Sequence, residues 1–383
     1  MAEEEDEIAS GNNYKDFLEY PTPLRLVQNN RREEFMRMVE SSTDRQAILN
    51  CVHLKSGDTP IIVASRHGHI DLLKFLISCG VDIEQRNKDL KRALHEAAAG
   101  SHLEGTKLLI SNNAEVDCLK RADWTPLMLS CAKSNVDVIR VLVQNGANLR
   151  LTNKDGWNCF HIAAREGQTN ILNYLLDSCT DIWNSCSKNG RTPLHTAALH
   201  GKADAVNLLL SRCGFTTDSP DCCGSTPLMD ALRAGHVQIA ETLIKTYKAS
   251  VNATDQLGRQ AIHLAAQAGC ISSVEYLITY HGVDVNVCTG KSQMIPLHLA
   301  AKEGHAQTLR YLLDKGAAIN KQDKNGRTAL HLSSAAGHEV CVDILLRVHN
   351  VDRGIKDCCG KTAKELALKP SVRDIFDKDR TVA

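Results

Sequence analysis

The hydrophobic residues between positions 189 and 210 fall into two short helical groups. The stretch NGRTPLHTAALHG (189–201) places Leu194 and two small residues, Ala197 and Ala198, where they face inward on a helix. A second aliphatic run, VNLLL (206–210), follows after a few polar residues. Small side chains let two helices approach closely, so this pattern predicts a pair of short antiparallel helices.

The ends of these helices are marked by residues that suit helix termini. Thr192 is expected to cap the first helix with its hydroxyl, and Pro193 fits the first helical position, where its missing N–H costs nothing. Gly201 is expected to end the helix in a left-handed conformation. Before the helix, KNG (188–190) is a tight-turn signal. The unit is therefore a hairpin loop followed by two helices.

The same unit recurs along the chain at a nearly constant spacing. The position that Thr192 holds, here called the Thr position, is matched at residues 59, 92, 125, 158, 226, 260, 295 and 328, in steps of 33 to 35. A period near 33 with the pattern T-P-L-H-x-A is the signature of ankyrin repeats. We therefore expect an all-α ankyrin-repeat solenoid of about nine helix-turn-helix repeats, with short β-hairpin loops and capping units at both ends.

The repeat pattern also divides the chain. Residues 1–13 are interpreted as an acidic disordered tail, because MAEEEDEIAS carries a run of carboxylates and little to bury. Residues 14–53 are expected to form N-terminal capping helices, residues 54–350 the nine repeats, and residues 351–383 a degenerate C-terminal capping repeat and tail. A cap needs one face on its neighbour and one in water, which the polar DCCGKTAKELAL (357–368) suits.

The histidine of the motif is expected to be structural rather than catalytic. Six repeats carry it three residues after the Thr position, whereas the other three carry Ile62, Met128 or Met229 there. A catalytic base is needed once and could not be replaced by isoleucine or methionine. The six are His95, His161, His195, His263, His298 and His331.

Composition removes several classes of function. Lysine plus arginine and aspartate plus glutamate both total 45, so the global charge favours neither nucleic acid nor a membrane. The sequence shows no apolar run of membrane-spanning length and no signal peptide. We interpret the 15 cysteines as mostly small buried hydrophobic residues in a reducing cytosol or nucleus, with zinc as the less favoured alternative. We expect no cofactor, no metal, and a cytoplasmic and nuclear location.

Two rows of loop positions carry candidate binding residues. Trp124 and Trp157 stand directly before the Thr position of adjacent repeats and are predicted to form an aromatic ledge on the concave side. Packing of each ring on its own loop is the alternative. Four residues before the Thr position, five successive repeats carry a cation: Lys55, Lys88, Arg121, Lys154 and Lys188. A solvated edge is the simplest interpretation, but such a row would also attract an acidic or phosphate-bearing partner.

Repeats three to five resemble one particular family. The stretches VDCLKRADWTPLM (116–128), NKDGWNCFHIAAREG (153–167) and RTPLHTAALHG (191–201) are similar to the ankyrin repeat domain-containing protein 16 family, as are NKDLKRALHEAA (87–98) and AAKEGH (300–305). The resemblance covers roughly residues 54–350. It implies a co-regulator that binds the catalytic domain of alanyl-tRNA synthetase. Such a protein accepts wrongly activated serine on its lysine side chains, so that the serine never reaches tRNA.

The resemblance assigns the acceptor role position by position. The acceptor lysine of the NKDGW motif falls on Lys154. The lysine of the VDCLK motif falls on Arg121, a poor acceptor because arginine is almost never neutral, so the neighbouring Lys120 would substitute. The third falls on Asn184, and Lys188 is the nearest lysine. The partner-binding candidates are Arg121, Trp124, Trp157, Trp183 and Arg191.

Two other classes of function are weighed against this one. The main alternative is a generic ankyrin-repeat adaptor or scaffold with an unrelated protein partner, which would normally need an appended recruiting segment. An enzyme is least favoured, because the sequence has no GxxxxGK[ST] loop, no HExxH motif and no nucleophile elbow. We expect a monomer that contacts the synthetase directly, without binding nucleic acid or a membrane itself.

Overall fold

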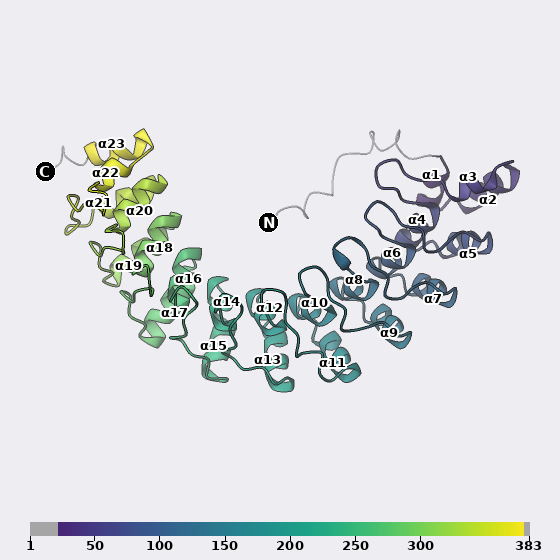
Figure 1. Cartoon of the computed structure of the whole chain (residues 1–383), viewed down its shortest axis with the longest axis horizontal. Helices are drawn as coiled ribbons and strands as arrows, with labels where there is room; N and C mark the ends of the chain where they lie inside the picture. The colour runs from purple at the N-terminus through teal and green to yellow at the C-terminus, as the bar shows by residue number, and fades with distance from the viewer. Residues whose placement is uncertain (1–21, 379–383) are drawn as a thin grey trace. The chain divides into compact units, whose positions relative to one another are not determined.

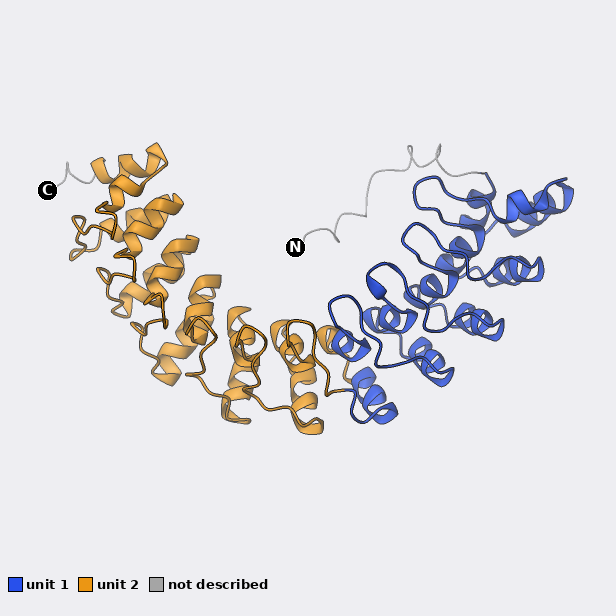
Figure 2. Ribbon diagram, in the orientation of Figure 1, with its two compact units in different colours: residues 1–163, 170–182 blue, residues 164–169, 183–383 orange. Residues whose placement is uncertain are grey.

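The computed structural model describes residues 22–378, and the predicted acidic tail, residues 1–13, lies outside the described residues. The described residues form two compact units, which Figure 2 colours separately. Among the described residues, unit 1 comprises residues 22–163 and 170–182, and unit 2 comprises residues 164–169 and 183–378. Both consist of short helices joined by loops, so the predicted all-α repeat fold is confirmed.

Unit 1 begins with three helices and continues with helix pairs. The first three are α1 (Thr22–Gln28), α2 (Arg32–Ser41) and α3 (Arg45–Leu49). The pairs are α4 (Pro60–His67) with α5 (Ile70–Ser78), α6 (Ala93–Ala99) with α7 (Leu103–Ser111), and α8 (Pro126–Ala132) with α9 (Val136–Gln144). The next pair, α10 (Cys159–Glu166) and α11 (Thr169–Ser178), is divided between the two units.

Unit 2 continues the same alternation of first and second helices. Its pairs are α12 (Pro193–Leu199) with α13 (Ala203–Arg212), α14 (Pro227–Arg233) with α15 (Val237–Lys245), α16 (Ala261–Ala268) with α17 (Ile271–His281), α18 (Pro296–Glu303) with α19 (Ala306–Asp314), and α20 (Ala329–Ala336) with α21 (Glu339–Leu346). The shorter α22 (Ala363–Leu366) and α23 (Pro370–Lys378) follow.

Within each unit the helices form two layers (Figure 1). First helices pack side by side, α4 on α6 and α6 on α8 in unit 1, and α12 on α14 through to α20 on α22 in unit 2. Second helices pack in the other layer. Fully buried alanines such as Ala97, Ala98, Ala197 and Ala198 permit the close approach of the first helices. Helix α1 packs on α4 in the same way and so covers the first repeat.

The helix ends follow the sequence signals. The hydroxyl of Thr192 accepts a hydrogen bond from the backbone N–H of His195 at 3.4 Å, and Pro193 is the first helical residue. Gly201 has a φ of 72°, as expected for a left-handed helix end. The predicted hairpin loops are closed by turn hydrogen bonds. Among the described residues they carry only isolated antiparallel bridges, at Lys120–Trp124 and Lys356–Thr362, rather than strands.

The motif histidines are buried and join one repeat to the next. In repeat five, Nδ1 of His195 accepts from the backbone N–H of Thr192 at 3.3 Å, and Nε2 donates to the carbonyl of Ser225 in the following repeat at 3.0 Å. His95 makes the same pair of bonds to Arg92 and Trp124 in unit 1. The structural interpretation of these histidines is therefore confirmed.

A second histidine series, which the sequence reasoning did not single out, joins the repeats in the opposite direction. His338 stands just before α21, and its Nε2 donates to the carbonyl of Lys302 in the preceding repeat at 3.0 Å. Its ring lies on Gly304, where an added Cβ would be 2.6 Å from Nδ1. The equivalent rings are His69, His102, His236 and His305. The recurring Gly-His dipeptide at the end of the first helix was the available signal.

Stability is expected to fall as the pH drops from about 6.5 towards 4. Burial lowers the pKa of His95 and of His263 to about 4, and it also lowers the pKa of His195. Below pH 6.5 the unfolded chain binds protons at these histidines while the folded chain does not, so protons favour unfolding in this window. Urea unfolding followed by circular dichroism from about pH 8 to pH 4 measures the effect. A midpoint that stays constant over this range would contradict it.

Substitution of Gly304 and of Gly316 distinguishes the cost of left-handed backbone from the cost of displacing a neighbouring side chain. Both are left-handed, with φ of 83° and 87°, but an added Cβ at Gly316 meets nothing within 4 Å. Gly316→Ala is expected to cost about 1 kcal/mol, from backbone strain alone. Gly304→Ala also displaces the ring of His338 and is expected to cost about 2–4 kcal/mol. Chemical unfolding of both variants measures the difference, and equal losses would show that the histidine contact contributes little.

Candidate functional site

The hairpin tips of unit 1 are joined to one another through their backbones. The N–H of Lys88 donates to the carbonyl of Ser56 at 2.9 Å, that of Arg121 to Asp89 at 2.9 Å, and that of Lys154 to Ala122 at 3.0 Å. The four tips, residues 53–58, 87–91, 120–124 and 153–157, therefore form one continuous strip, here called the hairpin edge of unit 1. The predicted cations Lys55, Lys88, Arg121 and Lys154 are all exposed along it.

Unit 2 has a hairpin edge of the same construction. The N–H of Cys222 donates to the carbonyl of Asn189 at 2.9 Å, and that of Lys324 donates to Ser292 at 3.0 Å. The predicted acceptor Lys188 is exposed at the first tip of this unit. The residues that follow it in the same row are Cys222, Gln256, Lys291 and Lys324, and all of them are exposed.

The third hairpin departs from the others. In the fourth, the side chain of Asn153 accepts from the N–H groups of Asp155 and Trp157 at 3.0 and 2.9 Å, which holds the turn. Lys120 takes the place of this asparagine and has no acceptor to offer. The turn instead places Ala122 and Asp123 at left-handed φ values of 63° and 61°. Such backbone is costly without glycine and is typical of functional positions.

The three predicted acceptor lysines are not equivalent. Lys154 and Lys188 are exposed at their tips, whereas Lys120 is half-buried. The amine of Lys120 lies 5.5 Å from the centre of the Trp124 ring, a contact that a protonated amine makes. Arg121 donates to the carbonyl of Lys88 at 3.2 Å. Of the two predicted acceptor lysines in unit 1, Lys154 is therefore the exposed one.

Each of the three tryptophans contacts another side chain of the fold. The ring of Trp157 stacks on that of His161 in its own repeat, with ring centres 6.2 Å apart. Trp124 and Trp157 are both half-buried, so the predicted ledge stays a prediction, and the stacking of Trp157 is what the alternative expects. Trp183 stands nine residues before the Thr position and packs edge-on against Phe215 at 5.2 Å. It belongs to a different row from the other two.

Arg191 is engaged within the fold. Its guanidinium forms ion pairs with Asp221 at 3.5 Å and with the fully buried Asp230, both from the next repeat. Arg233 also pairs with Asp230, at 3.2 Å. This network was missed from the sequence, and its signal was Asp230, a carboxylate at a helix position that is apolar in most repeats. The role of Arg191 in partner binding stays a prediction.

Unit 1 contains a similar network. Arg66 pairs with Asp58 at 2.8 Å and with Glu96 at 3.0 Å, and Lys91 pairs with Glu96 at 3.2 Å. Burial alone would raise the pKa of both carboxylates, but the hydrogen bonds and charge of Arg66 outweigh it and lower the pKa of Asp58 and of Glu96. Such clusters hold the hairpins against the helices and need no substrate to explain them.

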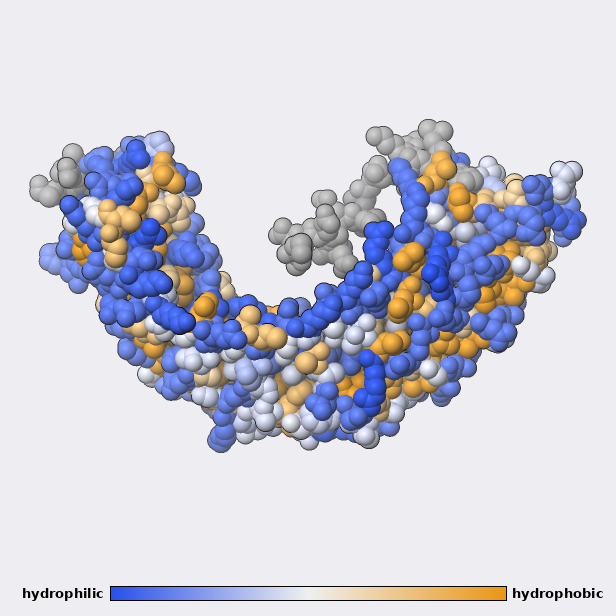
Figure 3. Space-filling model, viewed as in Figure 1, coloured by the Kyte–Doolittle hydropathy of each residue, from blue (hydrophilic) through white to orange (hydrophobic). Residues whose placement is uncertain are grey.

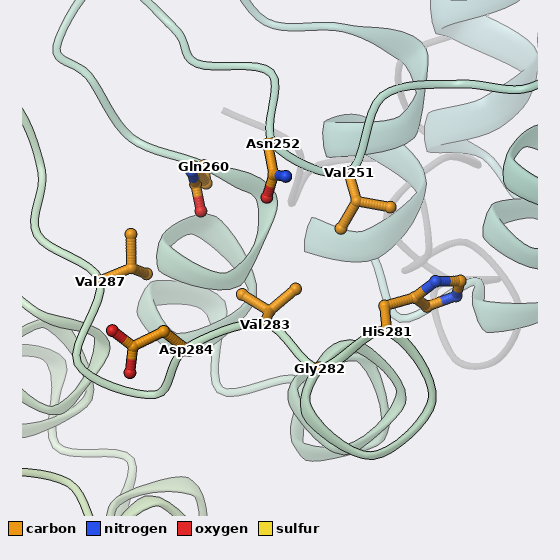
Figure 4. Close-up of a pocket in the computed structure, with 8 residues that line it drawn as sticks. All are labelled: Val251, Asn252, Gln260, His281, Gly282, Val283, Asp284 and Val287. Carbon is orange, nitrogen blue, oxygen red and sulfur yellow. The ribbon is translucent and has the colours of Figure 1, made fainter.

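A pocket of about 420 Å³ lies in unit 2, and none of the predicted site residues lines it (Figure 4). Figure 4 shows Val251 and Asn252 extending towards Val283. The eight lining residues are Val251, Asn252, Gln260, His281, Gly282, Val283, Asp284 and Val287. They include no cysteine, serine or lysine.

The interpretation of the cysteines needs a correction. Five are buried, namely Cys118, Cys131, Cys159, Cys213 and Cys341, whereas six are exposed, namely Cys186, Cys222, Cys223, Cys288, Cys358 and Cys359. The exposed ones lie in and around hairpin loops, where the repeat needs no apolar side chain. All 15 are free thiols. In residues 22–378 no group of three or more His, Cys, Asp or Glu side chains could hold a metal, and no helix there is long and apolar enough to cross a bilayer.

The sequence comparisons agree with this architecture. The sequence model of the family described as ankyrin repeats (3 copies) matches residues 25–120, 94–186, 178–255, 247–323 and 297–375. Rabankyrin-5 from Homo sapiens is 39% identical over 100 residues, which are 23% of this chain and 9% of that protein. Ankyrin repeat domain-containing protein 37 from Mus musculus is 36% identical over 86 residues, which are 22% of this chain and 54% of that protein.

The Neurogenic locus Notch protein of Drosophila melanogaster is 34% identical over 105 residues, which are 26% of this chain and 4% of that protein. The chain thus spans under a tenth of rabankyrin-5 and of Notch, and about half of the shorter relative. The overlapping family matches, however, run from residue 25 to residue 375. The chain therefore belongs to the ankyrin repeat family, whose members are generally non-enzymatic scaffolds for protein–protein interaction.

Proposed function

We propose that this protein binds the catalytic domain of alanyl-tRNA synthetase and captures misactivated serine on lysine side chains. The capture would prevent serine mischarging of tRNA(Ala) and protect translational fidelity. The resemblance of repeats three to five to the ankyrin repeat domain-containing protein 16 family suggested this role. The structural observation that supports it is the exposure of Lys154 at a hairpin tip, next to the half-buried Trp157 of the same turn.

The chemistry requires only a neutral amine beside an activated serine. The amine nitrogen of lysine attacks the carbonyl carbon of seryl adenylate and forms an amide bond. The bond from that carbon to the phosphate oxygen breaks, AMP leaves with the electron pair, and the nitrogen releases a proton to water. Lysine has an ordinary pKa of about 10.4, so few amines are neutral at pH 7 and proximity has to compensate. Each lysine reacts once, so the protein is a trap rather than an enzyme.

Exposure ranks the acceptor candidates. Lys154 and Lys188 are exposed at their tips, where a docked partner can reach them. Lys120 has to give up its position over the Trp124 ring before it can lose a proton and react. We therefore propose Lys154 as the principal acceptor, Lys188 as the second and Lys120 as the slowest. The partner contacts assigned to Arg121, Trp124, Trp157, Trp183 and Arg191 are part of the same proposal.

A generic adaptor with an unrelated protein partner is the second candidate. The ankyrin fold and the exposed hairpin edges support it equally well, because both serve any protein partner. Only the acceptor chemistry distinguishes the two proposals. In either case we propose that the protein meets its partner in the cytoplasm or the nucleus. We also propose that it acts without a cofactor.

Serine capture is expected on Lys154 when the full chain is incubated with alanyl-tRNA synthetase, ATP and labelled serine. Mass spectrometry of the digested protein locates the label. Lys154→Arg keeps the charge but removes the nucleophile, and it is expected to abolish labelling at this tip while the two proteins still co-elute. Lys324→Arg, at an exposed tip of unit 2, is the matched control and is expected to change nothing.

The outcomes separate the two candidates. Absence of label in a mixture where the two proteins co-elute would leave a synthetase-binding protein without acceptor chemistry. Absence of both label and co-elution would return the chain to the generic adaptors.

A further inference from the structure

Hydrophobic side chains are exposed on the hairpin edge of unit 1 and directly beside it. Among the described residues of this unit, the exposed large hydrophobic side chains are Val52, Leu54, Leu90 and Leu119, between 42% and 74% exposed. All four lie in the loops that precede α4, α6 and α8. Figure 3 shows hydrophobic residues at the surface among hydrophilic ones over the elements of this unit. Apolar side chains in neighbouring loops are typical of a binding surface.

The backbone conformation of Leu90 is the strongest indication that this surface binds a partner. It stands two residues before the Thr position, where Gly57, Gly156 and most other repeats have glycine. Its φ of 60° is left-handed, which is strained for a bulky residue, and its side chain is still 46% exposed. The fold gains little packing in return for this strain. Strain that packing does not reward is typical of positions kept for binding.

The same edge is basic. Its four tips carry six cations, Lys55, Lys88, Lys91, Lys120, Arg121 and Lys154, against four carboxylates, Asp58, Asp89, Asp123 and Asp155. Asp58 is buried and paired with Arg66. Two of the cations are paired as well, Lys91 with Glu96 and Arg121 with Asp89. Lys55, Lys88, Lys120 and Lys154 still outnumber Asp123 and Asp155. The edge therefore suits a segment that combines acidic with apolar side chains.

The chain itself contains such a segment immediately before Thr22. Residues 3–7 read EEEDE, and Tyr14, Phe17, Leu18 and Tyr20 follow between this run and α1. We propose that residues 1–21 dock on the hairpin edge of unit 1. In this arrangement the aromatic and aliphatic side chains contact Leu54 and Leu90, and the carboxylates of residues 3–7 pair with the cations of the tips.

The described helices place the start of this segment beside the edge. The ring of His69 bonds to the carbonyl of Gln28 at the end of α1, as the ring of His102 bonds to Arg66 near the end of α4. Helix α1 packs on α4, and equivalent histidines bond to the C-terminal ends of both helices. The two helices therefore run in the same direction, with their first residues at the same end of the pair. The first residue of α4 directly follows a hairpin tip. The chain therefore enters α1 at the hairpin edge.

The segment is also long enough. Glu7 lies 15 positions before Thr22, and at about 3.3–3.6 Å per residue this length can span about 50 Å. Adjacent helices are about 8–10 Å apart, so the four steps from α1 to the tip that precedes α10 cover about 40 Å. A tethered segment is present at an effective concentration in the millimolar range, which a second copy or a free peptide does not match at ordinary concentrations. The docked segment would compete with any partner that uses the same edge.

Zero-length carbodiimide cross-linking of the full chain tests this proposal without any synthetase, so its failure is separate from a failure of serine capture. The reagent joins a carboxylate and an amine that are in contact. We expect residues 3–7 to couple to Lys55, Lys88 and Lys154 at least about tenfold more than to Lys74 on α5 or Lys133 after α8, which are exposed on other sides of unit 1. The coupling should weaken when the salt concentration rises from about 0.05 M to about 0.5 M.

Leu90→Gly is the decisive variant, because glycine relieves the left-handed strain while it removes the apolar contact. It is expected to leave thermal stability equal or higher, and to lower the cross-link yield about fivefold. Equal yields on Lys74 and Lys88, or an unchanged yield in Leu90→Gly, would overturn the proposal. Cross-links between isotope-labelled and unlabelled chains would overturn it in favour of a second copy on the edge.

Discussion

The structure depends on one buried ring that satisfies the backbones of two repeats at once. In most repeats a histidine accepts from the N–H at the Thr position and donates to the residue just before the Thr position, or to a nearby loop residue, of the following repeat. Without this ring, the N–H and the carbonyl would be buried between the repeats with no hydrogen-bond partner, which would destabilise the folded state. Because the acceptor carbonyl belongs to a hairpin loop, the same bond fixes each hairpin against the preceding helix. The Gly-His contacts on the other side of the first helix complete the attachment.

Fixed hairpins explain why the tip residues line up. Within each unit the N–H of one tip bonds to the carbonyl of the tip before it, so a residue type that recurs in sequence becomes a strip in space. In unit 1 that strip is basic, and its second and third tips break the local rules: Leu90 and Asp123 replace glycine, and Lys120 replaces the capping side chain. Violations of local preference that gather on one exposed edge are more typical of binding than of folding.

Some charged side chains form ion pairs within the fold, whereas others are exposed and can contact a partner. Asp230 and Glu96 occupy helix positions that could hold apolar residues, and each is satisfied by two cations. Removing one partner of such a pair leaves a buried charge, so these side chains are parts of the scaffold. Lys154 and Lys188, by contrast, extend from the tips into solvent. The difference matters for the proposed function, since a side chain committed to the fold cannot easily become an acceptor.

The sequence by itself determined the fold class, the repeat spacing, the capping by Thr192 and Pro193, and the structural role of His195, because each of these is a local pattern that the chain repeats. It also located the row of exposed cations, since tips follow from turn residues. Only the tertiary structure decided that Arg191 pairs with Asp230, that Trp183 packs on Phe215, and that Lys120 lies over Trp124. It likewise decided which cysteines are buried. Those outcomes depend on side chains about 30 residues apart that meet when repeats stack, or on a single turn that departs from its neighbours, and repeat periodicity carries no information about either.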